Sequence, residues 1–459
     1  MSAQDKYLYP VTPETLHKYA EDIFAPVRRG ECVTTVWVPM AGRRMWNKFI
    51  NENIYLFEKE LPHYDKYLLV YIEPLDLTEE SLAGYIRLMA KSFIEVATNN
   101  ENVKNDKIQK YTEIFDDDKA TYSLLLTNLK HLLKETTDSG LEIVFFVGEF
   151  DELTFANTIF YNNLKSLWSQ LYPRLHYIFL MRERVTRKEN ISLWGELNEA
   201  ILQNIVYVPL AQDKDVDYWI DNFSSHYSFK INEKQKQVLK KLCGGHPYML
   251  KVAVRVINKH KDDNLSGDEL EDFLLDYYEL RSVSRGILDV RSDKERKLLL
   301  TIAKGSEFNV EDHKEYIKFF EKLGLVKKDD KGQYHLFGKL FEDAVLGTEE
   351  PKESHSSTET NGDLNLDENT GAILFKGKTV EERFTRQEYS ILTAFLQNEG
   401  KLLTRDDAGA VLWGKESYEK YSDWAIDQLI SKLRKKLNEL GVKDKLSTVR
   451  GKGYKYIKA

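Results

Sequence analysis

The sequence predicts a multidomain protein of the α/β plus α+β class, and three observations support this. The chain has 459 residues, too many for one ordinary domain. Up to about residue 210, nearly all-apolar strand patterns alternate with helical patterns, which indicates a parallel sheet covered on both faces. A basic helix followed by a basic hairpin lies near the C-terminus.

The first 210 residues are expected to form the parallel-sheet core. An N-terminal helical arm, with Thr12 as its N-cap, precedes the first strand. Helices are expected at about 78–97 and 154–171, with a polar helical segment at about 100–137. The expected strands are Val33–Val38, Tyr67–Ile72, Leu141–Val147, Leu175–Met181 and Ile205–Val208.

From Asp213 onward the strand patterns stop, and residues 211–280 read as a helical lid. Gly244 and Gly245 end one lid helix, and Pro247 begins the next. Residues 281–347 show a small winged-helix pattern, with two helices, a hairpin around Asp329–Gly332 and a closing helix. Its second helix has no basic surplus, so a packing role is expected there.

Residues 348–363 contain no large apolar side chain and read as a flexible linker. Residues 364–459 form the last domain. It is expected to begin with strand-like segments, continue through a helix at 385–398 with a Thr385–Glu388 capping box and a helix at 404–412, and end in the basic helix and hairpin.

Charge is distributed unevenly along the chain. The net charge is −8, yet residues 428–459 hold ten basic against two acidic residues. A basic end on an acidic body predicts a localised polyanion contact, although a merely solvated basic helix would look similar. Apolar runs are too short to span a membrane. No secretory signal is visible, and Cys32 and Cys243 lack metal or redox spacing, so a reducing cytoplasm is expected.

The last domain resembles the OmpR/PhoB-type winged-helix DNA-binding domain. The matching pieces include Phe384–Leu392, Leu412–Gly414, Ile430–Leu437 and Thr448–Tyr454, in the family's order. The resemblance implies an initial four-stranded sheet, three helices and a wing. The third helix would enter the major groove of double-stranded DNA, with the wing at the minor groove.

The resemblance assigns DNA-contacting roles to a set of polar residues. Lys and Arg neutralise phosphates, and an arginine suits a narrow minor groove. Trp424 and Leu429 depart from the polar residues usual at their places, and Tyr454 is expected in the core. The candidate DNA-binding residues are Asp427, Gln428, Ser431, Lys432, Arg434, Lys435, Thr448, Arg450 and Lys452.

Residues 12–345 resemble AAA-like NTPases of the STAND type, with degenerate nucleotide motifs. Where such proteins often have Arg-Arg-X-Gly-Lys-Thr, this chain has Arg43–Lys48. A phosphate loop needs glycine for close approach and lysine for charge. Trp46 is expected to fill that space, and Lys48 could help only through a shift of register.

The second nucleotide motif is also altered, because Gly148 stands in place of a magnesium-orienting aspartate while Glu149 remains. Asp151 and Glu152 are expected to cap the following helix. Arg182 matches a phosphate-sensing arginine, or simply pairs with Glu183 or Glu149. The vestigial nucleotide site would comprise Gly42, Arg43, Arg44, Lys48, Glu149, Arg182, His246 and Pro247.

These features predict a non-enzymatic, DNA-binding transcriptional regulator with no catalytic or metal-binding residues and no required cofactor. ATP or ADP binding stays open. The body would sense an unknown ligand or protein partner, or drive self-association, so that binding to DNA is dimeric or tandem. Two alternatives remain: an ATP-dependent STAND signalling switch with a DNA-binding output, and an interaction scaffold with weak DNA binding.

Overall fold

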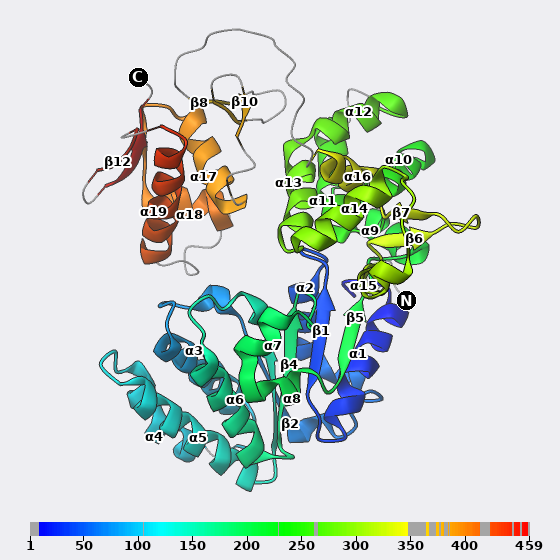
Figure 1. Ribbon diagram of the computed structural model, residues 1–459. Coiled ribbons are helices and arrows are strands. Elements are labelled where there is room, and N and C mark those ends of the chain that lie inside the picture. The colour runs from blue at the N-terminus through cyan, green and yellow to red at the C-terminus, as the bar shows by residue number, and fades with distance from the viewer. Residues whose placement is uncertain are drawn as a thin grey trace. The chain divides into compact units, whose positions relative to one another are not determined.

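The computed structural model describes residues 9–103, 105–227, 229–260, 265–347, 364–366, 373–375, 378–380, 384, 386–413, 423–442, 445–449 and 452–457 (Figure 1). The predicted linker at 348–363 and the wing residue Arg450 therefore lie outside the described residues. The chain divides into two units. The first comprises Met1–Gly267 and Gly286–Val345, and the second comprises Asp268–Arg285 and Leu346–Ala459.

A five-stranded parallel sheet forms the centre of the first unit, as the sequence predicts. The spatial order is β2-β3-β4-β1-β5, and every neighbouring pair runs parallel. β3 and β4 are almost entirely buried, which explains why they read as continuous apolar runs. The strands are β1 (Val33–Trp37), β2 (Tyr67–Ile72), β3 (Glu142–Val147), β4 (Leu175–Met181) and β5 (Ile205–Val208).

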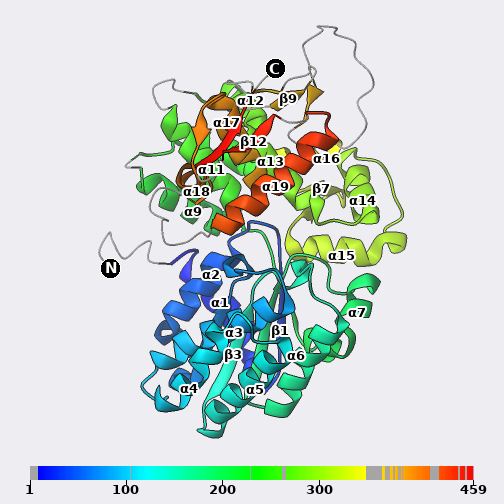
Figure 2. The same cartoon turned by 90° about the vertical axis from the view of Figure 1, so that its left-hand side faces the viewer.

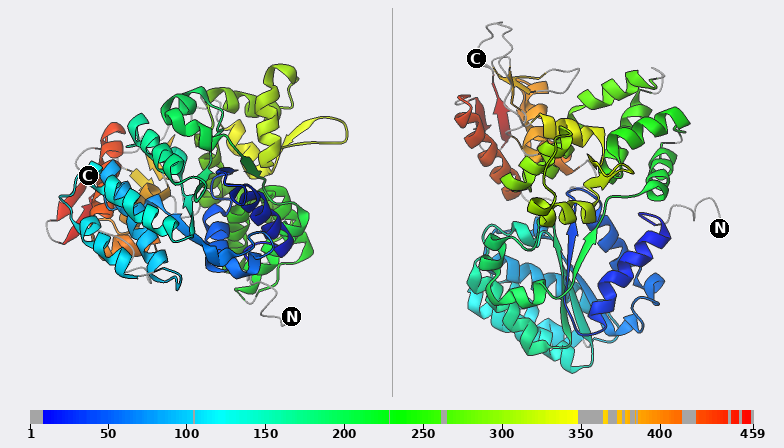
Figure 3. Two further views of the ribbon diagram at one scale, coloured as in Figure 1. Left: turned by 90° about the horizontal axis from the view of Figure 1, so that it is seen from below. Right: turned by 45° about the vertical axis from the view of Figure 1, so that its right-hand side comes forward.

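Helices cover both faces of this sheet (Figure 3). Adjacent residues of β3 show the two faces, because successive side chains of a strand point in opposite directions. Phe145 lies against Phe93 of α3 (Leu82–Thr98), whereas Phe146 lies against Phe24 of α1 (Pro13–Val27). The apolar stripe of each helix is therefore buried against its own face of the sheet.

The polar segment expected at about 100–137 is two helices rather than one. They are α4 (Asn105–Asp116) and α5 (Tyr122–Asp138), which pack beside α3 (Figure 2). Asp117–Thr121 separates them, and the Thr121 side chain caps α5 by accepting the Leu124 N–H. The remaining core helices are α2 (Arg43–Glu52), α6 (Thr158–Leu171), α7 (Lys188–Trp194) and α8 (Asn198–Ile201).

Between Asp213 and Asp289 the described chain forms helices and no strands. The helices are α9 (Asp213–Ser225), α10 (Glu233–Cys243), α11 (Pro247–Lys259), α12 (Asp268–Asp276) and α13 (Tyr278–Asp289). The predicted stop and start between α10 and α11 are confirmed, since Gly244 follows the last residue of α10 and Pro247 is the first of α11. The last lid helix that the sequence predicts, at 267–278, corresponds to α12, whereas α13 begins at Tyr278 and was not predicted.

A small winged-helix arrangement follows. It consists of α14 (Asp293–Ala303), α15 (Lys314–Leu323), the antiparallel pair β6 (Val326–Lys328) and β7 (Tyr334–Leu336), and α16 (Lys339–Leu346). Asp329 holds the hairpin turn, because its carboxylate accepts the N–H groups of Lys331 and Gln333. In the described part of the chain, no helix is long and apolar enough to cross a membrane.

The last domain has its own apolar core. Its helices are α17 (Arg386–Gln397), α18 (Arg405–Trp413) and α19 (Asp423–Glu439). A sheet of order β11-β13-β12 joins β11 (Leu402–Leu403), β12 (Leu446–Val449) and β13 (Gly453–Tyr456). The predicted C-terminal hairpin is confirmed by the antiparallel pairing of β12 and β13.

A four-stranded sheet is expected at the start of this domain. Among the residues described there, three strands form, β8 (Leu364–Leu366), β9 (Ile373–Phe375) and β10 (Lys378–Thr379), in the order β10-β9-β8. The basic helix buries an apolar stripe in the domain core: Ile426, Ile430, Leu433 and Leu437 are at most 1% exposed. Tyr454 is also in this core, as predicted.

Candidate functional site

The loop between β1 and α2 is the counterpart of a phosphate loop. Gly42 has a φ of 94°, a left-handed conformation that favours glycine, and α2 begins at the next residue, Arg43. In a P-loop, lysine follows the last glycine in the same way. Arg43, rather than Lys48, therefore occupies the place of the phosphate-binding cation, and no shift of register is needed.

Arg43 is held by an acidic partner from the neighbouring part of the sheet. Its guanidinium donates to Glu149 at 3.0 Å and to the Leu180 carbonyl at 3.4 Å. Only 11% of the Arg43 side chain and 23% of the Glu149 side chain are exposed. The carboxylate thus occupies the position next to Arg43 where an anionic ligand would be neutralised.

A second ion pair lies beside the first. Arg44 contacts Glu73, which follows β2, at 3.2 Å. Glu73 is 4% exposed, and its burial raises the pKa of its carboxyl group. Sequence reasoning missed Glu73. A signal existed, because Glu73 and Glu149 both follow the carboxyl ends of adjacent parallel strands, and such ends meet at one edge of the sheet.

Trp46 lies close to the loop glycine, because a Cβ on Gly42 would stand 3.3 Å from the Trp46 Nε1. Its ring also packs against Trp37 and Tyr19 at ring distances of 5.2 and 5.6 Å. Asn47 is buried and accepts a hydrogen bond from the Tyr19 hydroxyl at 2.8 Å. The Lys48 ammonium lies 3.6 Å from Glu52, one turn further along the helix surface.

Asp151 does not cap α6, contrary to the prediction. Its carboxylate accepts the backbone N–H groups of Arg182 and Glu183 at 2.7 and 2.8 Å, so it fixes the chain where β4 ends. Asn157 caps α6 instead. Arg182 pairs with Glu152, rather than with Glu149 or Glu183 as considered above. Burial lowers the pKa of the Arg182 guanidinium.

His246 connects the lid to the phosphate-loop segment. Its Nδ1 accepts the Met249 N–H at 3.3 Å, which caps α11, and its Nε2 lies 2.9 Å from the Pro39 carbonyl. These partners require a neutral ring with the proton on Nε2. Burial lowers the pKa of His246 to about 4. The predicted role in the turn before Pro247 is confirmed, and the link to Pro39 is additional.

A cavity of about 490 Å³ opens beside Arg43. It brings together all the sequence-predicted nucleotide-site residues except His246, which is buried nearby. Its other lining residues come from β1, the loop after β1, α2 and the lid, and sequence reasoning did not find them. The lining comprises Trp37, Val38, Met40, Gly42, Arg43, Arg44, Met45, Lys48, Glu149, Arg182, Phe223, Pro247, Tyr248 and Lys251.

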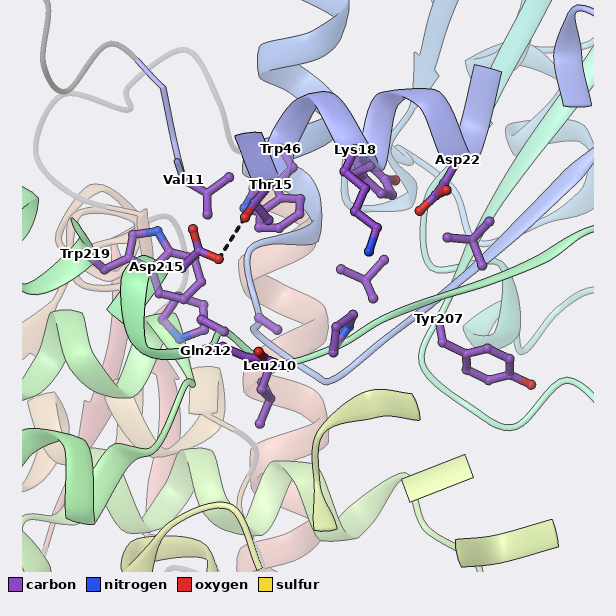
Figure 4. A pocket seen from close by; sticks show the side chains of 17 residues that line it. Val11, Thr15, Lys18, Asp22, Trp46, Tyr207, Leu210, Gln212, Asp215 and Trp219 are labelled. Carbon is purple, nitrogen blue, oxygen red and sulfur yellow. Dashed lines mark hydrogen bonds between the residues drawn. The ribbon is translucent and has the colours of Figure 1, made fainter. Parts of the chain in front are cut away.

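A second cavity, of about 290 Å³ and lined in part by Trp46, lies between α1, the segment after β5, and α9 (Figure 4). Asp215 of α9 accepts hydrogen bonds from the Thr12 and Thr15 hydroxyls. Thr12 stands at the N-cap position of α1, but its side chain makes no capping bond. The expected cap residue therefore joins the N-terminal arm to the lid instead.

The candidate DNA interface is the exposed face of α19 and the adjacent hairpin. Ser431, Lys432 and Lys435 are exposed on α19, and Thr448 and Lys452 are exposed on the hairpin. Gln428 lies on the same helix, and Leu429 is partly buried against the domain core. The departure at Leu429 is therefore a packing residue, which explains why it is not polar.

Two predicted contact residues also have structural partners. Arg434 donates to the Leu446 carbonyl and to the Thr448 hydroxyl, both at 2.9 Å, so it fixes the hairpin to α19. Asp427 accepts two bonds from Arg405 of α18 at 3.0 and 3.1 Å, and it also bonds the Tyr454 hydroxyl. These contacts orient Asp427 toward its own domain and reduce its capacity to accept from a base.

The expected capping box involves Thr385, which lies outside the described residues. Its other member, Glu388, is 2% exposed and bonds the Lys436 ammonium at 2.6 Å. Lys436 is part of the basic run of α19, so one of those cations holds α17 and α19 together. Among the described residues, no group of His, Cys, Asp and Glu side chains could hold a metal ion.

Comparison with known proteins assigns a class to the last domain. Residues 379–456 match the family model described as "Transcriptional regulatory protein, C terminal". The part of the chain with the basic helix and hairpin is therefore a transcription-regulatory DNA-binding domain. Over 73 residues the chain is 30% identical to the uncharacterized transcriptional regulatory protein YvcP of Bacillus subtilis, and this match spans 16% of the chain and 30% of that relative.

The body has remote likenesses among solved structures. The Walker-type ATPase of Pyrococcus abyssi has 15% identity and a TM-score of 0.43, covering 72% of this chain and 95% of that one. The ORC2 protein of Aeropyrum pernix has 12% identity and a TM-score of 0.42, covering 74% and 95%. The RuvB branch migration motor of Thermotoga maritima has 14% identity and a TM-score of 0.33, covering 74% and 96%.

Proposed function

We propose that the protein is a sequence-specific DNA-binding transcriptional regulator whose body responds to a ligand or partner without hydrolysing nucleotide. The observation that carries the proposal is the exposed Ser431–Lys432–Lys435 face of α19, adjacent to the hairpin, in a domain of the regulatory class. A helix of this kind fits the major groove, and the hairpin beside it reaches the flanking backbone.

The chemistry of the body supports the absence of hydrolysis. Gly148 offers no carboxylate to orient a magnesium ion, and Arg44 stands where a P-loop has a hydroxyl side chain. Glu149 is paired with Arg43 and is thereby engaged away from an attacking water. Hydrolysis needs the phosphates, the metal and the water to be positioned together, so we expect neither ATP nor ADP to be required for binding to DNA.

We also propose that two copies bind adjacent DNA sites. One winged-helix reader makes a modest interface, and linking two binding events raises the overall affinity by orders of magnitude. The effective partner in this arrangement is a second copy of the chain on tandem or symmetric half-sites.

DNA binding by the full-length protein tests the main proposal. The double variant Lys432→Ala/Lys435→Ala should bind its selected DNA site at least about 100-fold more weakly, because it removes two cations that bind phosphates or bases. The slope of log K against log salt should fall by about 0.9 for each phosphate that the protein no longer neutralises. Affinity is measured by fluorescence anisotropy on a site first selected from random DNA.

Lys401→Ala is the matched control, since Lys401 is exposed in the turn before β11. Unchanged affinity in the double variant would refute the assigned interface. Weak binding to every sequence, with a steep salt slope, would instead favour the interaction scaffold. The rival ATP-dependent switch is favoured by the cavity beside Arg43, and micromolar ATP binding with turnover would establish it in place of a non-hydrolysing body.

A further inference from the structure

We propose that the 490 Å³ cavity beside Arg43 binds a small organic anion with an apolar part, such as an aryl phosphate, and binds it without a metal ion. The inference rests on the proposed function in one respect, namely that the body responds to a ligand. It goes further by naming the chemical class of that ligand and the residues that recognise it.

The charge of the cavity lining selects an anion. Five cationic side chains face one carboxylate, that of Glu149: Arg43, Arg44, Lys48, Arg182 and Lys251. Glu73 pairs with Arg44, Glu52 with Lys48 and Glu152 with Arg182. With Glu149 on Arg43, four carboxylates offset the five cations, and an excess of one positive charge remains. An anion entering the cavity would gain charge-assisted hydrogen bonds from guanidinium groups, whose planar geometry suits phosphate and carboxylate.

The remaining wall of the cavity is apolar and aromatic. An inorganic ion has no apolar surface to bury against this wall, whereas an organic anion has. Trp37, Met40, Met45, Phe223 and Tyr248 line it. Met40 and Met45 are 37% and 41% exposed, which is high for large apolar side chains. Methionine adapts to irregular apolar shapes, and the volume lies in the range of pockets for small organic ligands.

Backbone strain marks the same place. Three described residues other than glycine have a positive φ: Met40 at 57°, His63 at 59° and Glu149 at 45°. Two of the three, Met40 and Glu149, line this cavity. A left-handed conformation at a non-glycine residue costs about 1–3 kcal/mol and tends to persist at functional sites, which favours a binding role over simple packing.

The Arg43–Glu149 pair indicates how the ligand would bind. The Glu149 carboxylate occupies the place of an anion on the guanidinium, and a ligand oxyanion can replace it there. A metal is not required, because the arginines supply the positive charge that Mg²⁺ supplies to a nucleotide, and Gly148 supplies no ligand for Mg²⁺.

The test is titration of the full-length protein with phenyl phosphate in the presence of EDTA, followed by isothermal calorimetry and Trp fluorescence. Phenyl phosphate should bind about tenfold more tightly than inorganic phosphate, because its ring is buried against the apolar wall. Glu149→Gln should tighten binding about tenfold by removing the competing charge, and Lys251→Gln should weaken it about threefold to tenfold.

Lys91→Gln is the matched control, because Lys91 pairs with Asp116 on the surface of α3 and α4, away from the cavity. Lys251 is exposed, so its replacement leaves the packing intact and keeps the test decisive if the Glu149 variant is unstable. Phenyl phosphate that fails to bind, binds only with Mg²⁺, or binds the Glu149→Gln and Lys251→Gln variants like the wild type would overturn the inference.

DNA binding measured on the same samples separates the two proposals. A protein that binds its DNA site but shows no such binding of phenyl phosphate refutes only the ligand class. A protein that binds phenyl phosphate as expected but no DNA refutes only the regulatory function.

Discussion

Lys435 and Lys436 are neighbours in sequence with different roles in the structure. Lys435 is exposed on the α19 face, whereas Lys436 bonds the buried Glu388. Lys436→Ala should lower the free energy of unfolding by about 2 kcal/mol, because it leaves a buried carboxylate without its cation. Lys435→Ala should change that free energy by less than about 0.5 kcal/mol and weaken DNA binding instead. Urea unfolding of each variant measures the difference.

The paired replacement Lys436→Met with Glu388→Leu provides the control. It removes both charges, and apolar substitution of a buried ion pair is often neutral or stabilising. Recovery of most of the stability would attribute the destabilisation to the loss of the Lys436–Glu388 ion pair. If Lys436→Ala were as stable as the wild type, the pair would have no structural role.

For individual residues, the sequence predicted which ones belong to the site but not which side chains or backbone groups they bond. The sequence indicated that Glu149 and Arg43 belong to one site, but not that they bond each other, since 106 positions separate them. It assigned Asp151 to a helix cap from its local position, whereas its partners are N–H groups at the end of β4. Such contacts depend on which strands are neighbours, and one sequence does not give that order.

At the scale of elements, local sequence patterns predicted helices and strands better than they predicted the contacts of single residues. The five strands and the Pro247 start of α11 follow from patterns within a few residues. The C-terminal hairpin was also predictable, and Gly453 shows why glycine stands there: its φ is 140°, and a Cβ would lie 2.2 Å from the Leu403 carbonyl oxygen. The start of α2 was missed because the resemblance placed the phosphate-binding lysine at the position of Asn47, which follows Arg43 by more than one helical turn.

The joint between α11 and the phosphate-loop segment should be sensitive to acid through His246. The folded state holds the pKa of His246 at about 4, below the ordinary value of about 6.5 in an unfolded chain. The neutral ring therefore contributes stability that is complete above about pH 6.5 and is lost as the pH falls toward 4. Between pH 7 and pH 5 the wild type should lose about 2 kcal/mol through this group.

His246→Asn provides the comparison for this prediction, because an asparagine oxygen can still accept the Met249 N–H but does not titrate. Urea unfolding at pH 7 and pH 5 should show a loss of stability that is smaller in the variant by about 2 kcal/mol. An equal loss in both proteins would mean that another group controls the acid response.

At the scale of the whole molecule, the division into two units predicts two unfolding transitions. Each unit has its own core, and the first also holds a buried cation, Arg291, which donates to the Arg182 carbonyl at 3.0 Å and the Ile287 carbonyl at 3.3 Å. Burial lowers the pKa of Arg291 to about 10. These bonds join the start of the winged-helix segment to the end of β4, beside the proposed ligand cavity.

Arg291→Met should lower the midpoint of the first unit's transition by about 5 °C, because the Arg182 and Ile287 carbonyls lose a donor in a buried setting. Lys436→Ala should lower only the transition of the second unit, by about 10 °C, since a smaller unit shifts more for the same free energy. Differential scanning calorimetry of the full chain resolves both. A single transition that moves with either substitution would show that the regulator unfolds as one cooperative body, and a ligand in the first unit would then stabilise the DNA-binding domain directly.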